Sequence, residues 1–126
     1  MPEHVHLILL PREIDYDISA ILSTVKQSVA KRAILFVNQQ APAFADRMLD
    51  RAPNGDPTLR FWQRGGGYDR NLYTPKEIWE KINYVHGNPV ERGLADSPGD
   101  WLWSSAADYA GIRQGPLPIN WDSIPR

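Results

Sequence analysis

Apolar side chains follow two different spacings in the first third of the chain. Residues 4–10, HVHLILL, form a short and mostly apolar run bounded by Pro11, which predicts a strand. Because apolar side chains would lie on both faces of this strand, we expect it inside a sheet rather than at an edge. Residues 17–39 predict a long helix with Asp17 as its N-cap, because apolar residues recur there about every 3.6 positions. These residues are Ile18, Ile21, Leu22, Val25, Val29 and Phe36.

The middle of the chain predicts shorter elements separated by loops. Residues 44–49 favour a short helix, and a loop is expected through Asn54–Gly55. Residues 58–63, TLRFWQ, predict a short strand. The consecutive glycines at residues 65–67 indicate backbone without a regular element.

A second helix is predicted to begin sharply at TPKE. Thr74 is its expected N-cap, Pro75 its first residue, and Glu77 completes a capping box with Thr74. The predicted buried stripe consists of Ile78, Ile82 and Val85.

The end of this helix and the rest of the chain carry weaker signals. We expect the helix to end near Gly87–Asn88, because Pro89 disfavours helical geometry at the residue before it. Residues 99–111 predict an aromatic cluster with one helical turn, and residues 110–126 an irregular tail.

Length and composition favour a folded, single-domain chain over residues 1–126. Five Trp and 42% hydrophobic residues argue against disorder, and the absence of Cys excludes disulfides and thiolate metal sites. A reducing cytoplasm suits such a chain, and no run resembles a signal peptide or a membrane span. The net charge of −1 argues against a broadly basic nucleic-acid surface. From Arg60 to Arg92, six basic residues against four acidic ones leave a slight local excess of positive charge.

His4 and His6 are the first candidates for chemistry. On a strand they lie on one face, with Cα atoms roughly 6.5–7 Å apart, so their imidazoles can share one metal ion. The alternative is a pair of half-buried histidines that form hydrogen bonds to neighbouring groups. The H-x-H pattern alone does not distinguish the two.

Tyr84 lies on the second predicted helix, well over 100° from the centre of its apolar stripe. Lys81 and Asn88 share its side, so a phenol nucleophile and an amide ligand could act together. The alternative is an amphipathic tyrosine at the edge of the domain, with Asn88 ending the helix. His86 points away from Tyr84, and we interpret it as structural.

The loop FWQRGGGYDRN, residues 61–71, combines aromatic rings, guanidinium groups and flexible backbone. Such a loop can stack on bases and contact phosphates. A turn that is pinned by a buried Trp62 explains the same composition.

Four segments in this order resemble the IS200-like transposases, in particular the REP-associated tyrosine transposases among the HUH single-stranded DNA nucleases. The segments are MPEHVHLILLP, FWQRGGGYDRN, INYVHGNPVERGL and DWLWSSAADY. Together they span about residues 2–109, and YVHGNPVERGL followed by DWLWSS is the most specific part.

The resemblance implies a metal-and-tyrosine active site. Its metal ligands are His4, His6 and Asn88, its nucleophile is Tyr84, and its metal is Mg²⁺ or Mn²⁺. The implied reaction cleaves and rejoins single-stranded or hairpin DNA through a 5′-phosphotyrosine. We add Lys81 as a group that favours the phenolate. The candidates for DNA contact are Arg64, Tyr68, Arg70 and Lys81.

The resemblance also implies an α+β, ferredoxin-like fold, an antiparallel sheet with helices on one face. A strand normally precedes the HUH strand, whereas here the motif begins near Met1. We therefore expect a chain that lacks the first strand, is truncated at its N-terminus and is poorly stable or self-associates, for instance as a homodimer.

Two other functions compete with this one. The first is an inactive or domesticated remnant that binds DNA without turnover. The second is an unrelated H-x-H metal hydrolase, which would need further carboxylate or histidine ligands.

Overall fold

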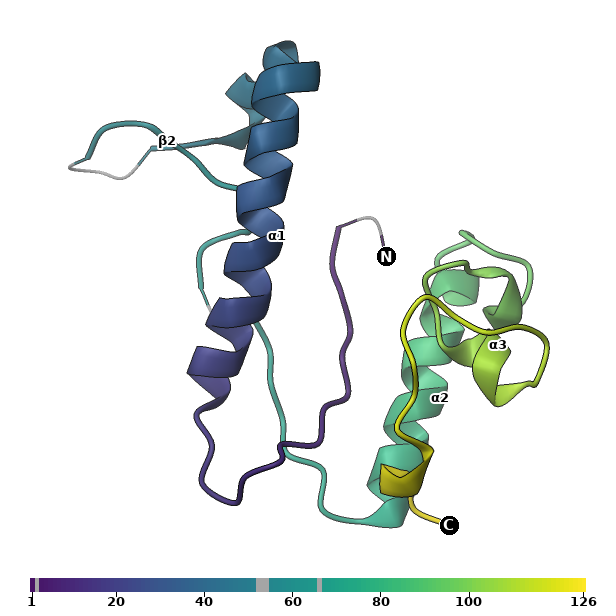
Figure 1. Ribbon diagram of the computed structural model, residues 1–126. Coiled ribbons are helices and arrows are strands. Elements are labelled where there is room, and N and C mark those ends of the chain that lie inside the picture. Colours follow the sequence, from purple (N-terminus) through teal and green to yellow (C-terminus); the bar gives the residue numbers. More distant parts are fainter. Residues whose placement is uncertain (2, 52–54, 66) are drawn as a thin grey trace. The chain divides into compact units, whose positions relative to one another are not determined.

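The computed structural model describes residues 1, 3–51, 55–65 and 67–126 (Figure 1). Helices and one small antiparallel sheet make the fold α+β. The chain divides into two compact units, Met1–Arg12 with Arg70–Arg126, and Glu13–Asp69, which we describe separately. The single domain over residues 1–126 stays a prediction. Within the described part of the chain, no helix combines the length and apolar character that crossing a bilayer requires.

Helix α1, Ile18–Gln40, dominates the unit Glu13–Asp69 and begins where the sequence predicts. The Asp17 carboxylate accepts a hydrogen bond from the backbone N–H of Ser19 at 2.8 Å, so it satisfies a donor that the first turn leaves free. A 3₁₀ helix, η1 (Pro42–Met48), follows and confirms a short helical segment near residues 44–49.

The buried side of α1 differs from the predicted stripe. Val37 is buried, whereas Val25, Val29 and Phe36 are exposed. The indole N–H of Trp62 donates to the backbone carbonyl of Lys26 at 2.9 Å, and the helix therefore turns this side toward the loop. Since α1 carries apolar residues on more than one side, its sequence period alone did not select the side that packs.

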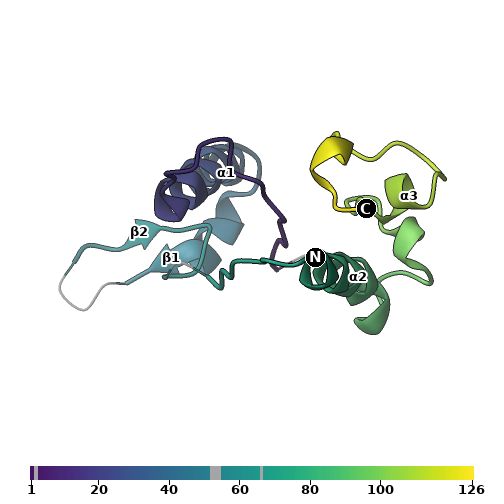
Figure 2. The ribbon, with the colours of Figure 1, turned by 90° about the horizontal axis from the view of Figure 1, so that it is seen from below.

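Strands β1 (Leu49–Asp50) and β2 (Thr58–Leu59) form the antiparallel sheet of this unit, beside α1 (Figures 1 and 2). Leu49 pairs with Leu59, and Asp50 with Thr58. The predicted strand over residues 58–63 is therefore real but shorter. Asn54 of the predicted loop and Gly66 of the glycine run lie outside the described residues, while Gly65 and Gly67 adopt positive φ angles of 98° and 87°.

The strand predicted over residues 4–10 is wrong for the described part of the chain. This segment belongs to the other unit and pairs with no described strand, since the described ladder joins β1 to β2 alone. A strand is stabilised by its hydrogen-bonded partner, which an apolar sequence does not supply. Instead of lying inside a sheet, the segment leaves a set of apolar side chains exposed: Val5, Leu7, Ile8, Leu9 and Leu10.

Helix α2, Pro75–Glu91, starts as predicted. The backbone N–H of Glu77 donates to Thr74 Oγ1 at 3.2 Å, and the Glu77 carboxylate accepts from the backbone N–H of Thr74 at 3.1 Å. The capping box is therefore complete.

The predicted end of α2 near Gly87–Asn88 is wrong, because the helix continues through Pro89. It ends in a Schellman turn, where the N–H of Gly93 donates to Val90 O and that of Leu94 to Pro89 O. Gly93 adopts the required positive φ of 65°. Since Pro89 lies within the last turn, only one intrahelical hydrogen bond is lost, and the glycine determines where the helix stops.

The C-terminal part of the chain packs against α2, on the face that carries Ile82, which is only 4% exposed. It contains η2 (Pro98–Asp100), the predicted helical turn as α3 (Ala106–Tyr109), and η3 (Trp121–Ser123). The centroid of the Tyr109 ring lies 5.0 Å from that of the His86 ring and 4.9 Å from that of the Trp121 ring. The indole of Trp79 donates to Pro125 O at 3.0 Å, which joins the tail to α2.

Candidate active site

His4 and His6 lie next to each other at the start of the chain. Their Nε2 atoms are 3.1 Å apart, and their rings meet edge to face. The intervening Val5 is exposed and has no part in this contact. The two imidazoles are half-buried, and the contact is a hydrogen bond in which one ring nitrogen donates to the other.

Tyr84, on helix α2, contacts the histidine pair through the ring of His6. Its ring centroid lies 5.8 Å from that of His6, and the side chain is 49% exposed, so Tyr84 is not a core residue. One turn earlier, the Lys81 ammonium lies 4.5 Å from the centroid of the Tyr84 ring. Lys81 therefore stacks on the face of the phenol in a cation–π contact. One histidine pair, one phenol and one ammonium thus meet within a single unit.

The surroundings hold the pKa of His6 below its ordinary value. Partial burial is the main cause, followed by the positive charges of His4, the N-terminal ammonium and Lys81. His6 therefore stays neutral at neutral pH, and one of its two ring nitrogens carries no proton. Neutral imidazole is the form that binds metals.

The spacing of the two nitrogens fits a shared divalent cation. Two ligands at right angles, each about 2.1 Å from one ion, are about 3 Å apart. The Nε2 atoms are 3.1 Å apart in the hydrogen bond that joins the two rings, and a shared ion would replace that hydrogen bond at a similar spacing. Among the described residues, no third His, Cys, Asp or Glu completes a cluster with them.

Asn88, the predicted third ligand, lies one turn after Tyr84 on α2. It is only 8% exposed, and its Nδ2 donates to the backbone carbonyl of Tyr84 at 3.3 Å. The amide therefore bonds to its own helix. Its role as a metal ligand stays a prediction.

The predicted DNA-contact residues are distributed over both units. Arg64 and Tyr68 belong to Glu13–Asp69, where the Arg64 guanidinium pairs with Asp50 at 2.9 Å and Tyr68 is 85% exposed. Arg70 belongs to the unit of the histidine pair and forms an ion pair with Glu77 at 2.8 Å. Lys81 is the one member of this group with a described contact to Tyr84.

Two charged residues beside the histidines were missed by the sequence reasoning. Glu3 forms an ion pair with Arg92, and its Oε1 lies 3.6 Å from His4 Nδ1. In the sequence, only the position of Glu3 directly before His4 indicates that Glu3 could lie near the histidine pair. The pairing with Arg92 required knowledge that α2 extends to residue 91.

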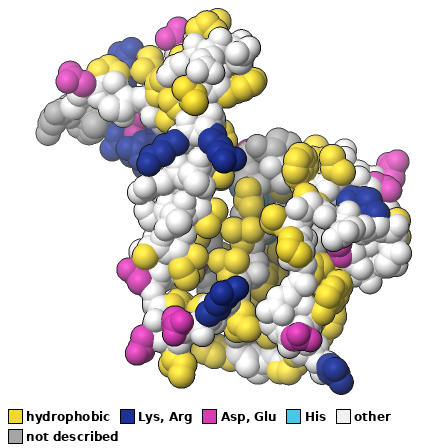
Figure 3. All heavy atoms as spheres, viewed as in Figure 1, with side chains coloured by type: hydrophobic (Ala, Val, Ile, Leu, Met, Phe, Trp, Pro, Cys, Tyr) yellow, Lys and Arg dark blue, Asp and Glu magenta, His cyan; other side chains and the backbone are white. Residues whose placement is uncertain are grey.

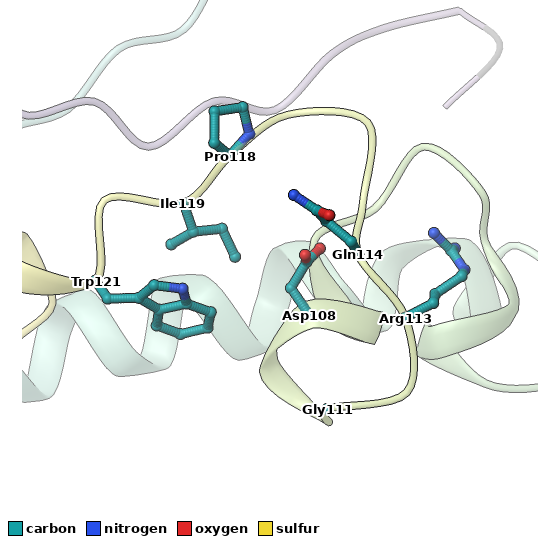
Figure 4. A pocket seen from close by; sticks show the side chains of 7 residues that line it. All are labelled: Asp108, Gly111, Arg113, Gln114, Pro118, Ile119 and Trp121. Carbon is teal, nitrogen blue, oxygen red and sulfur yellow. The ribbon is translucent and has the colours of Figure 1, made fainter.

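A hollow of about 460 Å³ in the same unit contains none of these residues (Figure 4). The Asp108 carboxylate lies within it, with Trp121 and Ile119 to one side and Arg113 to the other. Asp108 Oδ1 accepts from the backbone N–H of Gly115 at 2.8 Å, while Oδ2 is buried. Asp108 thus holds the loop after α3 in place, and we assign it a structural role.

No family model, curated protein or solved structure matches this chain. The candidate site therefore depends on its own geometry and chemistry.

Proposed function

We propose that this protein cleaves and rejoins single-stranded DNA, with a divalent cation and a 5′-phosphotyrosine intermediate. The observation that carries the proposal is the position of the His4–His6 nitrogen pair beside the Tyr84 ring. A metal-binding pair next to an exposed phenol is what a tyrosine nucleophile needs at a phosphodiester.

His4 and His6 would hold Mg²⁺ or Mn²⁺, with Asn88 as the proposed third ligand. When bound, such an ion withdraws electron density from the scissile phosphate and makes the phosphorus more electrophilic. The depressed pKa of His6 favours this role, because neutral imidazole is the form that binds a metal ion.

Tyr84 would supply the nucleophile. Its phenolic oxygen forms a bond to phosphorus, and the bond from phosphorus to the 3′-oxygen breaks. The phenolic proton leaves to solvent, and the departing 3′-oxygen takes up a proton as a free hydroxyl. Attack by a second 3′-hydroxyl reverses these steps and rejoins the strands, so no nucleotide hydrolysis is needed.

Lys81 would stabilise negative charge on Tyr84 as the phenol is deprotonated. Its ammonium already lies over the ring. Lys81 would also contact a nearby phosphate once DNA is bound, as would Arg64, Tyr68 and Arg70 along the strand.

A ferredoxin-like sheet with helices on one face belongs to the same proposal. The helices and the small antiparallel sheet are compatible with it.

A DNA-binding module without turnover is the second candidate function. It is favoured by the incomplete ligand set, since no third His, Cys, Asp or Glu joins the pair among the described residues. Such a module would bind hairpin DNA and form no covalent product.

A gel assay separates the two functions. The protein is incubated with Mn²⁺ and a labelled single-stranded DNA that carries a hairpin, and denatured products are separated by size. We expect a slow-migrating covalent adduct from the wild type, reduced to background in Tyr84→Phe and in His4→Ala/His6→Ala. Tyr73→Phe removes another exposed phenol and is the matched control. Binding without an adduct would support the module instead.

A further inference from the structure

The segment that carries the histidines is held against α2 by side chains. Residues 4–10 join no described ladder, so backbone pairing does not place them. Two contacts connect the segment to α2: the His6 ring on Tyr84, and the ion pair of Glu3 with Arg92. All of these residues belong to one unit.

The two contact points are separated by a similar distance along the segment and along α2. Three extended residues from Glu3 to His6 span about 10 Å. Eight helical positions from Tyr84 to Arg92 span about 12 Å. The segment therefore lies antiparallel to α2 and is attached at two points, Glu3 at Arg92 and His6 at Tyr84.

Arg92 is well suited to be a fixed point. It is the C-cap residue of α2, and its backbone N–H donates to Asn88 O at 3.1 Å within the Schellman turn. Its backbone is therefore held where the side chain leaves the helix. Glu3 lies directly before His4, and its carboxylate oxygen is 3.6 Å from His4 Nδ1.

We infer that the Glu3–Arg92 ion pair is a positioning device that sets the register of the His4–His6 pair over Tyr84. Glu3 and Arg92 would act through the histidine segment and not on the reacting atoms, so both are positioning residues. The register itself is a structural claim, and its use in catalysis rests on the proposed function.

NMR of the full-length, metal-free protein tests the register directly. We expect the nuclear Overhauser effects between the His6 and Tyr84 rings to fall at least severalfold in Glu3→Gln and in Arg92→Gln. The matched control is Glu80→Gln, which breaks an exposed ion pair with Lys76 on the same helix and should leave these signals unchanged. Unchanged ring contacts in both Glu3→Gln and Arg92→Gln would overturn the inference.

Charge exchange separates a lost ion pair from a damaged fold. The double variant Glu3→Arg/Arg92→Glu restores the pair with its charges reversed, and we expect it to recover the ring contacts. Failure to recover them, with the helical circular dichroism intact, would also overturn the inference.

Mn²⁺ binding supplies a second readout. We expect roughly three- to fivefold weaker affinity in Glu3→Gln and Arg92→Gln at low salt, because a half-exposed ion pair contributes modestly. The difference in Mn²⁺ affinity between the wild type and these variants should shrink in high salt, because salt screens the Glu3–Arg92 ion pair of the wild type. A difference that persists undiminished in high salt would contradict an ion-pair mechanism. If the ring contacts respond as expected while the wild type forms no DNA adduct, the positioning inference stands and the proposed function fails.

Discussion

At the residue scale, the candidate site depends on a His6 side chain that remains neutral. The alternation of His4 and His6 could be predicted from the sequence, because residues two apart on an extended chain face one side. The lowered pKa of His6 could not be predicted from the sequence, because it depends on burial and on charges that the fold brings close, Lys81 among them. The structural role of His86 was predicted, and its hydrogen bond to Ser105 Oγ at 2.9 Å agrees with it.

Acidification should destabilise the unit that contains His6 and His86, because the fold lowers the pKa of each. Burial lowers the pKa of His86 below its ordinary value of about 6.5, so the unfolded chain takes up this proton at a higher pH than the folded chain. The free energy of unfolding should therefore fall as the pH drops below about 6.5. Thermal melts from pH 7.5 to 5 measure this change. His86→Gln should show a shallower decline, with His6 supplying the remainder, and an equally steep decline would contradict the explanation.

Two glycines of the same unit should respond in opposite ways to alanine. A Cβ at position 115 would overlap Asp108 Oδ2, whereas one at position 87, within α2, would meet open space. We expect Gly115→Ala to cost about 1–3 kcal/mol and Gly87→Ala to stabilise by about 0.5–1 kcal/mol. Urea unfolding measures both. A neutral Gly115→Ala would show that the Asp108 loop is free to relax.

At the element scale, local signals predicted where helices begin better than where elements pair or end. Asp17 and the Thr74–Glu77 box are local, since a cap satisfies donors within its own first turn. The strand over residues 4–10 needed a partner that its own sequence does not specify. Pro89 predicts too early an end for α2, because a proline in the last turn removes only one hydrogen bond and the helix continues to Glu91.

The capping box makes α2 sensitive to its first residue. Thr74→Ala removes the acceptor for the backbone N–H of Glu77 and should destabilise the protein by about 1 kcal/mol. The control, Thr24→Ala, lies inside α1, where the hydroxyl only bonds back to Ala20 O, and it should be neutral or slightly stabilising. Equal effects of the two substitutions on urea unfolding would argue against the cap.

At the scale of the whole molecule, apolar side chains remain at the surface of both units (Figure 3). The segment after the histidines is the densest example, with Leu7, Ile8, Leu9 and Leu10 all exposed in succession. An unpaired apolar segment is a ready template for association with another chain.

Self-association should therefore be reduced by charges in this segment. Leu7→Lys/Leu9→Lys places two charges on exposed apolar positions of this segment and should shift the protein toward monomer. Sedimentation velocity over a range of concentrations measures this shift. The control Leu35→Lys/Phe36→Lys places two charges on exposed positions of α1. A wild type that remains monomeric at all concentrations would contradict the prediction.

The central claim is that Tyr84 attacks DNA beside the histidine pair, and peptide mass mapping of the covalent product tests it most directly. Protein treated with Mn²⁺ and hairpin-bearing single-stranded DNA is digested with nuclease and protease, and the modified peptide is sequenced by tandem mass spectrometry. We predict a nucleotide phosphate on Tyr84, absent without metal and absent in His4→Ala/His6→Ala. A nucleotide on any other residue, or no covalent product although the DNA binds, would contradict the account.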